Sequence, residues 1–277
     1  MTHRIVADSA ADLLTLSLAP FSSVPLKITA GEHTYVDDEA LDVSGMVNAL
    51  RAFKGRSRTA CPSPDEWLAA FGDAENVFCV TITSTLSGSH NAACVAAREY
   101  QDKFPGRRVL VIDSLSAGPG MLLLVEKLEE LIQQGLDLDA IAQAMADYQK
   151  TTHLVFVLES LRNFVSNGRV SPAVGALAGL LGIRIVGIAS AAGDLKPIAK
   201  CRSAKKALAE IVENLRERGF SGGKVRISHC RNENAAQALK EAILTAWPRA
   251  EVIIRCTRAL CSYYAEEGGV LVGFESA

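Results

Sequence analysis

The chain has 277 residues, enough for one large domain or for two smaller lobes that each bury a core. Apolar residues make up 49% of it, which excludes a disordered chain. The 29 basic and 31 acidic side chains nearly cancel, and no basic tract or aromatic platform stands out, so nothing points to nucleic acid. No apolar run reaches about 18 residues and no signal peptide is evident. We therefore expect a soluble, cytoplasmic protein without a membrane span.

Strand and helix patterns alternate through the first half of the chain. Strands are expected at residues 4–7, 24–28, 34–36, 76–82 and 108–112, the second and third of them as a hairpin. Helices are expected at 43–53, from Ser63 onward, and at 87–100, 121–133 and 138–149. Ser63-Pro64-Asp65-Glu66 is typical of a helix start, with a serine cap, a proline and acidic residues in the first turn.

A second series of elements follows residue 150. Strands are expected at 153–158, 183–189, 224–228, 252–255 and 270–274, and helices at 161–165, 172–181, 203–218, 235–246 and 259–264. Such alternation predicts an α/β fold in which each lobe is a largely parallel sheet flanked by helices. The boundary falls after two consecutive helices, which divides the chain into lobes 1–150 and 151–277.

Motifs for common catalytic sites are absent. The sequence has no GxxxxGK[ST], GxGxxG, HExxH or GxSxG, and its five histidines are scattered. Its seven cysteines are odd in number and have no CxxC spacing, so we expect reduced, mostly buried thiols. The sequence therefore indicates no catalytic residue, no metal site and no cofactor.

The segment Thr81–Ser89 is the most informative one. A buried strand runs into hydroxyl-bearing residues and then into a helix. Ligands of open α/β sheets bind at strand carboxyl ends, and a helix N-terminus attracts anions. Ser84, Ser87 and Ser89 add hydrogen-bond donors, and Gly88 lets a ligand approach the backbone. The segment therefore suits an acidic head group; the alternative is that Ser87 only caps the helix.

Three other segments are further candidates for contact with such a ligand. Thr59, in the stiff loop 58–64, could present a hydroxyl, although that segment is also an ordinary helix entry. Arg169 lies between two expected helices and suits carboxylate recognition, unless it is a solvated turn residue. The apolar, small-residue stretch 173–183 could wall an alkyl ligand or be a packed core helix.

These segments, taken in order, resemble the DegV family of bacterial fatty-acid-binding proteins. The resemblance rests on seven motifs: Asp8-Ser9 with Asp12-Leu13; Val24-Pro25-Leu26 with Tyr35-Val36-Asp37; Arg58-Thr59-Ala60-Cys61-Pro62-Ser63; Thr83-Ser84-Thr85-Leu86-Ser87-Gly88-Ser89; Val111-Ile112-Asp113-Ser114; Leu158 through Asn167-Gly168-Arg169-Val170-Ser171; and Cys201-Arg202-Ser203-Ala204-Lys205-Lys206-Ala207. Each motif alone is weak, but seven in sequence are specific and cover nearly the whole chain.

The resemblance implies a two-lobed DegV-like (EDD) fold with a long-chain fatty acid between the lobes. Thr59 and Ser84 would contact the carboxylate, with Ser87 and Gly88 beside them, and the tail would run into the second lobe. Arg169 would lie near the head group and near the surface that docks a partner. Family members deliver the acyl chain to a separate fatty-acid kinase and lack chemistry of their own.

The sequence departs from the family near its C-terminus. Many members carry an H.GPG loop there, whereas this chain has Cys256-Thr257-Arg258-Ala259-Leu260 and continues to Tyr264. The departure indicates a divergent branch, in which Arg258 is a candidate cation for the head group.

Two alternatives stay open at this point. One is an enzyme, a hydrolase or transferase, that acts on a small anionic substrate at the same cleft through Asp8, Ser84 and Arg169. The other is a regulatory protein in which lipid loading signals to a partner. The first would need a general base beside a nucleophile, which no motif supplies.

Overall fold

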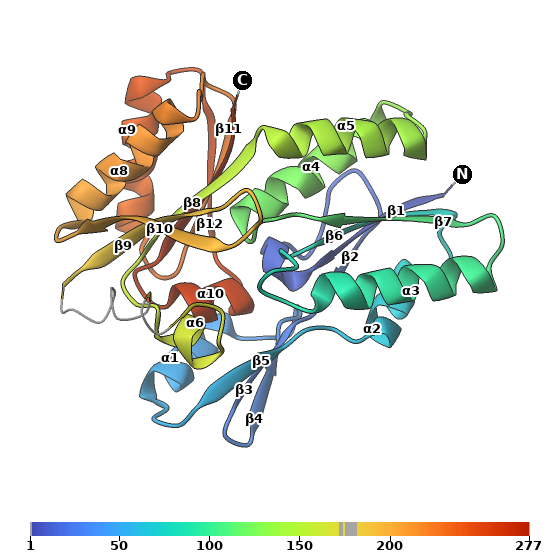
Figure 1. Ribbon diagram of the computed structural model, residues 1–277, viewed down its shortest axis with the longest axis horizontal. Coiled ribbons are helices and arrows are strands. Elements are labelled where there is room, and N and C mark those ends of the chain that lie inside the picture. The colour runs from blue at the N-terminus through green and yellow to red at the C-terminus, as the bar shows by residue number, and fades with distance from the viewer. Residues whose placement is uncertain (1, 172–173, 175–181, 277) are drawn as a thin grey trace.

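The computed structural model describes residues 2–171, 174 and 182–276, which form an α/β structure built on three sheets (Figure 1). The α/β class predicted from the sequence is confirmed. The expected helix over 172–181, and with it most of the apolar stretch 173–183, lies outside the described residues.

The first sheet is parallel and buried on both faces. Its strands, in the order β2-β1-β6-β7, are β2 (Phe21–Val24), β1 (His3–Asp8), β6 (Asn76–Thr81) and β7 (Arg108–Asp113). Helices α4 (Pro119–Gln133) and α5 (Leu138–Lys150) cover one face, and α2 (Pro64–Phe71) and α3 (Ser89–Lys103) cover the other (Figure 1). Successive side chains of a strand point to opposite faces, so Ile5 and Ala7 pack with α4 and α5 whereas Val6 packs with α2 and α3.

A small antiparallel sheet projects from the first one. It has the order β4-β3-β5, with β3 (Lys27–Ala30), β4 (His33–Val36) and β5 (Ser57–Ala60), and α1 (Val43–Ala52) lies between β4 and β5 in the chain. The hairpin expected from the sequence is confirmed as β3 and β4. The sequence did not predict β5, which carries Thr59.

The third sheet differs from the expected parallel arrangement. Its order is β10-β9-β8-β13-β11-β12, with β8 (Thr152–Leu158), β9 (Arg184–Ala189), β10 (Leu195–Cys201), β11 (Lys224–His229), β12 (Glu251–Cys256) and β13 (Val270–Glu275). Only β11 and β12 pair in parallel; the other four pairings are antiparallel, so the prediction of a largely parallel second sheet is wrong. Two features cause this: a short turn joins β9 to β10, which permits only antiparallel pairing, and β13 inserts between β8 and β11.

The remaining helices complete the second half of the chain. Helices α8 (Ala204–Glu217) and α9 (Glu233–Ala246) pack on one face of the third sheet (Figure 1). Two short helices, α6 (Arg162–Ser166) and α10 (Ala259–Ala265), lie below the other face. The proposed boundary at residue 150 stays a prediction.

Helix α4 packs on both large sheets. Gly273 of β13 lies so close to the start of α4 that a Cβ atom there would be 2.4 Å from the carbonyl oxygen of Pro119. Only glycine allows this approach of the two backbones. The helix therefore serves as a common wall between the first sheet and the third.

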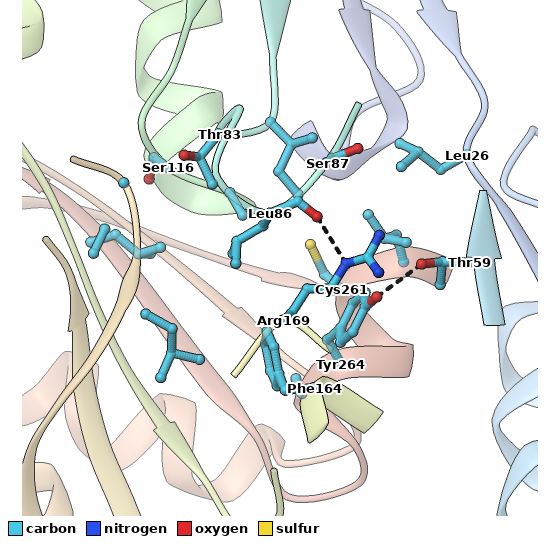
Figure 2. Close-up of a pocket in the computed structure, with 18 of the residues that line it drawn as sticks. Leu26, Thr59, Thr83, Leu86, Ser87, Ser116, Phe164, Arg169, Cys261 and Tyr264 are labelled. Atoms are coloured by element: carbon cyan, nitrogen blue, oxygen red, sulfur yellow. Dashed lines mark hydrogen bonds between the residues drawn. The ribbon is translucent and has the colours of Figure 1, made fainter. Parts of the chain in front are cut away.

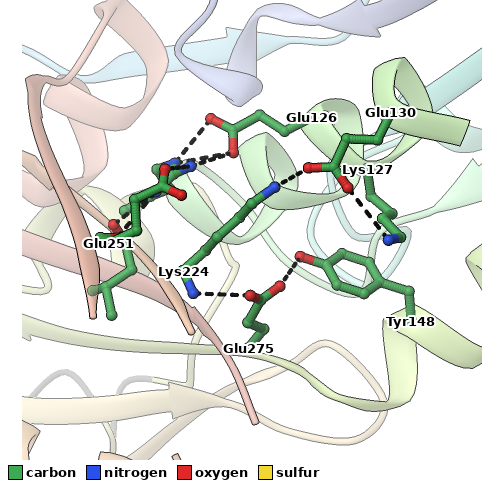
Figure 3. Close-up of polar contacts among 9 residues, drawn as sticks. Glu126, Lys127, Glu130, Tyr148, Lys224, Glu251 and Glu275 are labelled. Atoms are coloured by element: carbon green, nitrogen blue, oxygen red, sulfur yellow. Dashed lines mark hydrogen bonds and ion pairs between the residues drawn. The ribbon is translucent and has the colours of Figure 1, made fainter. Parts of the chain in front are cut away.

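A charged network extends this contact along α4 (Figure 3). The buried Arg226 of β11 donates through Nε to Glu126 of α4 at 2.9 Å and through Nη2 to Glu251 of β12 at 2.7 Å. Lys224 pairs with Glu130 one turn further along α4. Because Arg226 is buried, its charge must stay paired, which fixes α4 against the strand.

Helix α10 is held at its N-terminus by carboxylates from the beginning of the chain. Asp37, fully buried, accepts the backbone N–H groups of Ala259 at 3.2 Å and Leu260 at 3.0 Å. Asp12 accepts the backbone N–H of Arg258 at 2.7 Å. These N–H groups have no partner within the helix, and negative charge is favourable at this end of it. Residues more than 200 positions apart are thereby joined.

Burial makes the Asp12 carboxyl a weak acid. Loss of hydration raises its pKa from an ordinary value of 3.8 to about 7, and the neighbouring Asp37 adds to the rise. The fold thus favours protonated Asp12, and this contribution to stability is full below pH 4 and is lost as the pH rises through 7.

We predict that Asp12→Asn changes the pH dependence of stability. The neutral amide cannot ionise, so the variant should gain stability relative to the wild type, by on the order of a few kcal/mol, between pH 5 and pH 8. Urea unfolding of both proteins across this range measures the difference, from which the titration of groups that do not interact with Asp12 cancels. Parallel stability curves for the two proteins would contradict the assignment.

Candidate ligand-binding site

A cavity of about 290 Å³ lies where the three sheets meet. Its walls are mainly apolar and include Ile82, Leu86, Leu154, Phe156, Leu158 and Leu271. Three of these come from alternate positions of β8, so that one face of this strand forms a continuous apolar floor. An extended hydrocarbon matches such walls, because burying it costs no hydrogen bonds.

A cluster of polar side chains lies at one end of the cavity, whereas Thr83, Ser116 and Asp194 line it separately from this cluster (Figure 2). The hydroxyls of Thr59 and Tyr264 share a hydrogen bond of 2.8 Å. Arg169 donates from Nε to the carbonyl oxygen of Leu86 at 3.0 Å, which holds its guanidinium beside the tyrosine. Ser87 lies on the opposite wall. This end can offer several donors to one acidic group.

The backbone of the hydroxyl-rich turn is fixed by carboxylates at the ends of two strands. Asp8, which ends β1, accepts the N–H of Ile82 at 2.9 Å and the hydroxyl of Ser89 at 2.6 Å. Asp113, which ends β7, accepts the N–H of Ser84 at 3.1 Å. Both carboxylates therefore position the turn and do not themselves line the cavity.

The six residues predicted for the head-group site divide into two sets. Thr59, Ser87, Gly88 and Arg169 all line the cavity, although they come from three separate segments of the chain. Ser84 is exposed and is not among the lining residues.

Arg258 also lies outside the cavity lining. Its Nε is 3.4 Å from the Asp37 carboxylate, and it donates from Nη2 to the carbonyl oxygen of Asp38. The guanidinium is thus engaged at the N-terminus of α10, where it offsets the charge of Asp37.

Sequence reasoning missed Tyr264, which comes from α10 and stands near the place of the absent H.GPG loop. Its ring packs on Phe164 with 4.6 Å between ring centroids. Burial raises the pKa of Tyr264, so its hydroxyl keeps the proton and can donate it in a hydrogen bond. The helical spacing of Leu260 and Tyr264, four residues apart, could have predicted that both face the same cavity.

Two thiols, Cys61 and Cys261, also line the cavity. Burial raises the pKa of Cys261 well above its usual value, and the nearby Asp12 adds to the rise, so this thiol is not a nucleophile. All seven cysteines are free, as expected, but Cys256 is exposed.

A second, larger cavity of about 530 Å³ lies on the other side of α10. Adjacent residues of this helix face the two cavities, Tyr264 the first and Tyr263 the second. The walls of the second are ionic: Arg51 pairs with Glu267, and Arg184 pairs with Glu159, each at 2.7 Å. Burying an alkyl chain there would break these interactions, so the first cavity is the better site for an apolar ligand.

Other kinds of site find no support in the part of the chain that the structure describes. It has no group of His, Cys, Asp and Glu side chains that could hold a metal ion. Within the same residues, no helix has the length and apolar character needed to cross a membrane.

The chain matches known proteins over its whole length. A family model described as "Uncharacterised protein, DegV family" matches residues 2–276. A DegV domain-containing protein of Streptococcus pneumoniae is 44% identical over 279 residues, with 99% of both chains covered.

Two solved structures have nearly the same fold. One is the Streptococcus pneumoniae Fatty Acid Kinase (Fak) B3 protein loaded with linoleic acid, which is 44% identical, with a TM-score of 0.97 and complete coverage of both chains. The other is a DegV family protein from Eubacterium eligens loaded with heptadecanoic acid, 41% identical, with the same TM-score and coverage. The chain therefore belongs to the DegV family.

Proposed function

We propose that this protein binds a long-chain fatty acid, with the tail in the apolar cavity and the carboxylate at its polar end. The observation that carries the proposal is the division of this cavity into apolar walls and one end with several hydrogen-bond donors. The two solved structures described above, 44% and 41% identical, are loaded with fatty acids, which supports the same class of ligand here.

The tail supplies most of the binding free energy. An acyl chain with about 15 methylenes gains on the order of 12 kcal/mol from leaving water, at roughly 0.8 kcal/mol for each. The cost of ordering the chain and losing its free motion reduces this gain. The head group therefore mainly fixes the direction in which the chain enters.

Thr59, Ser87 and Tyr264 are the proposed hydroxyl partners of the carboxylate, and Gly88 gives it access to the backbone. Arg169 stands beside them and would balance its charge. The proposed roles of Ser84 and Arg258 are indirect in this arrangement, because neither lines the cavity. Ser84 would act through the turn.

We further propose that the two lobes divide the ligand. Lobe 1–150 provides the turn at residues 82–88 and the strand with Thr59, which hold the head group. Lobe 151–277 provides the floor formed by β8 and Leu271, on which the tail lies. Tyr264 and Arg169 are exceptions to this division, because they belong to lobe 151–277 but contribute to the polar end of the cavity.

The chain would present the carboxylate to a fatty-acid kinase in the cytoplasm and perform no chemistry itself. The name of the Streptococcus pneumoniae relative, Fatty Acid Kinase (Fak) B3 protein, supports the partnership. Hydroxyl partners leave a carboxylate oxygen able to accept a phosphoryl group. The enzyme alternative loses support because no histidine is among the described residues that line the cavity, and the Cys261 thiol there is not activated.

The protein purified from a bacterial host should carry a fatty acid. Because the apolar cavity binds the tail tightly, denaturing extraction and mass spectrometry should find close to one fatty acid for each chain. A control unfolding measurement should first show that the purified protein is folded. If such protein yields only traces of lipid on extraction, the proposal is contradicted.

Thr59→Val should weaken the binding of fatty acids without changing the shape of the site. The substitution removes one hydrogen bond to a charged group, which corresponds to a loss of about 10-fold or more in affinity. Competition binding with palmitic acid and its methyl ester measures this effect, and the ester, which has no charge, should lose less. Thr34→Val, which removes an exposed hydroxyl from the neighbouring β4, is the matched control and should bind like the wild type. Equal losses for acid and ester would remove Thr59 from the head-group site.

A further inference from the structure

We propose that Gly187 of β9 and Phe156 of β8 together set the length of acyl chain that the cavity accepts. This inference rests on the proposed function, because it concerns the tail of the same ligand. Neither residue belongs to the polar end of the cavity, and neither has a charge or a hydrogen-bonding side chain. Their effect would arise from space alone.

The two residues face each other across neighbouring strands. Phe156 pairs directly with Gly187 in the antiparallel register of β8 and β9, so both lie on the same face of the sheet. The phenylalanine ring lies over the glycine: a Cβ atom at position 187 would be 2.5 Å from its Cε2 and 2.6 Å from its Cζ. Real Cβ atoms do not come so close to other heavy atoms, so the ring occupies the space that any other residue at 187 would need.

The requirement for glycine here is one of space rather than of backbone conformation. Gly187 is not among the residues with a left-handed backbone, and it lies within β9, opposite Pro197, where the register with β10 shifts. Alanine can therefore adopt its backbone angles without strain. The carbonyl oxygen of Lys196 on the next strand, 3.1 Å from the position of that Cβ, needs to move only by a few tenths of an ångström.

A side chain at 187 would push the Phe156 ring toward the ligand. On its other neighbouring strand Phe156 pairs with Leu271, which also lines the cavity and blocks movement in that direction. Leu154 and Leu158 flank it along β8. The cavity is the free space next to the ring, so the displaced ring would take volume from the acyl tail. The absence of a side chain at Gly187 thus lets the Phe156 ring lie over this residue and leaves the cavity volume free for the acyl tail.

The expected size of the effect follows from the burial of methylene groups. Each buried methylene contributes about 4-fold in affinity. A raised ring that excludes two of them should cost a long chain about 15-fold, whereas a chain short enough to end before Phe156 should lose little. The signature is therefore a change in the ratio of affinities, not a uniform loss.

The test compares the binding of lauric, myristic, palmitic and stearic acid to the wild type and to Gly187→Ala. The ratio of stearic to lauric affinity should fall about 15-fold in the variant. Adding Phe156→Leu to Gly187→Ala removes the displaced ring and should restore most of the ratio. If Gly187→Ala does not fold, the single variant Phe156→Leu still tests the inference. It should enlarge the cavity and therefore raise the ratio of stearic to lauric affinity.

Val186→Ala is the matched control. Val186 is next to Gly187 on the same strand but packs on the opposite face of the sheet with α8 and α9. It should lower stability and leave the ratio unchanged. Unchanged ratios in Gly187→Ala and Phe156→Leu, or equal losses for all four acids, would overturn the inference while leaving fatty-acid binding intact. Failure of the wild type to bind any of the acids would instead refute the proposed function.

Discussion

The structure depends on how the N-terminus of α10 is buried. The first N–H groups of this short helix are shielded from solvent, and the carboxyl groups of Asp37 and Asp12 accept them. Both carboxylates come from the beginning of the chain, so α10 can form in this position only when the first sheet and the third have come together. The helix then separates two cavities of opposite character, one apolar and one lined by ion pairs.

Buried or partly buried carboxyl groups that hold neighbouring polar groups in place also occur elsewhere in the molecule. Asp8 and Asp113 hold the backbone of the hydroxyl-rich turn, and Glu126 holds the buried Arg226 beside α4. In each case a charged group stabilises the scaffold rather than meeting the ligand. The walls of the first cavity are mainly apolar, with hydroxyls and Arg169 gathered at one end, which suits a ligand whose affinity comes from its tail.

The first half of the fold could be predicted well from local signals. Strands β1, β6 and β7 of the first sheet, the hairpin of β3 and β4, and the start of α2 at Ser63 all follow from patterns within a few residues. The serine caps α2 as expected, and the structure adds Glu66 to form a capping box. Strand β2, at Phe21–Val24, was not predicted. The third sheet could not be predicted in the same way. Its strand order depends on β13 inserting between β8 and β11, which is a contact between distant segments. Strand β10 was missed because Pro197 disfavours a strand, although an edge position tolerates it.

The candidate site shows the same limit. Hydroxyls near strand ends pointed to Thr59 and Ser87, and the structure places both on the cavity wall. Arg258 was predicted to bind the head group from its position in the sequence alone. In the structure its guanidinium instead lies beside the carboxylate of Asp37, which balances its charge. Tyr264 was overlooked because its partner Thr59 is 205 residues away in the chain. A local sequence pattern can identify residues that lie in the same turn. Residues from distant segments that line the same cavity can be identified only from the three-dimensional structure.

We propose that one mainly apolar cavity, with a polar end formed by Thr59, Ser87, Arg169 and Tyr264, holds a fatty acid in a fixed direction. A crystal structure of the protein with palmitic acid tests it most directly. We predict that the carboxylate lies within hydrogen-bond distance of the Thr59 and Tyr264 hydroxyls and that the chain passes over Phe156. A chain in the reverse direction, or one bound in the ionic cavity on the other side of α10, would contradict the account.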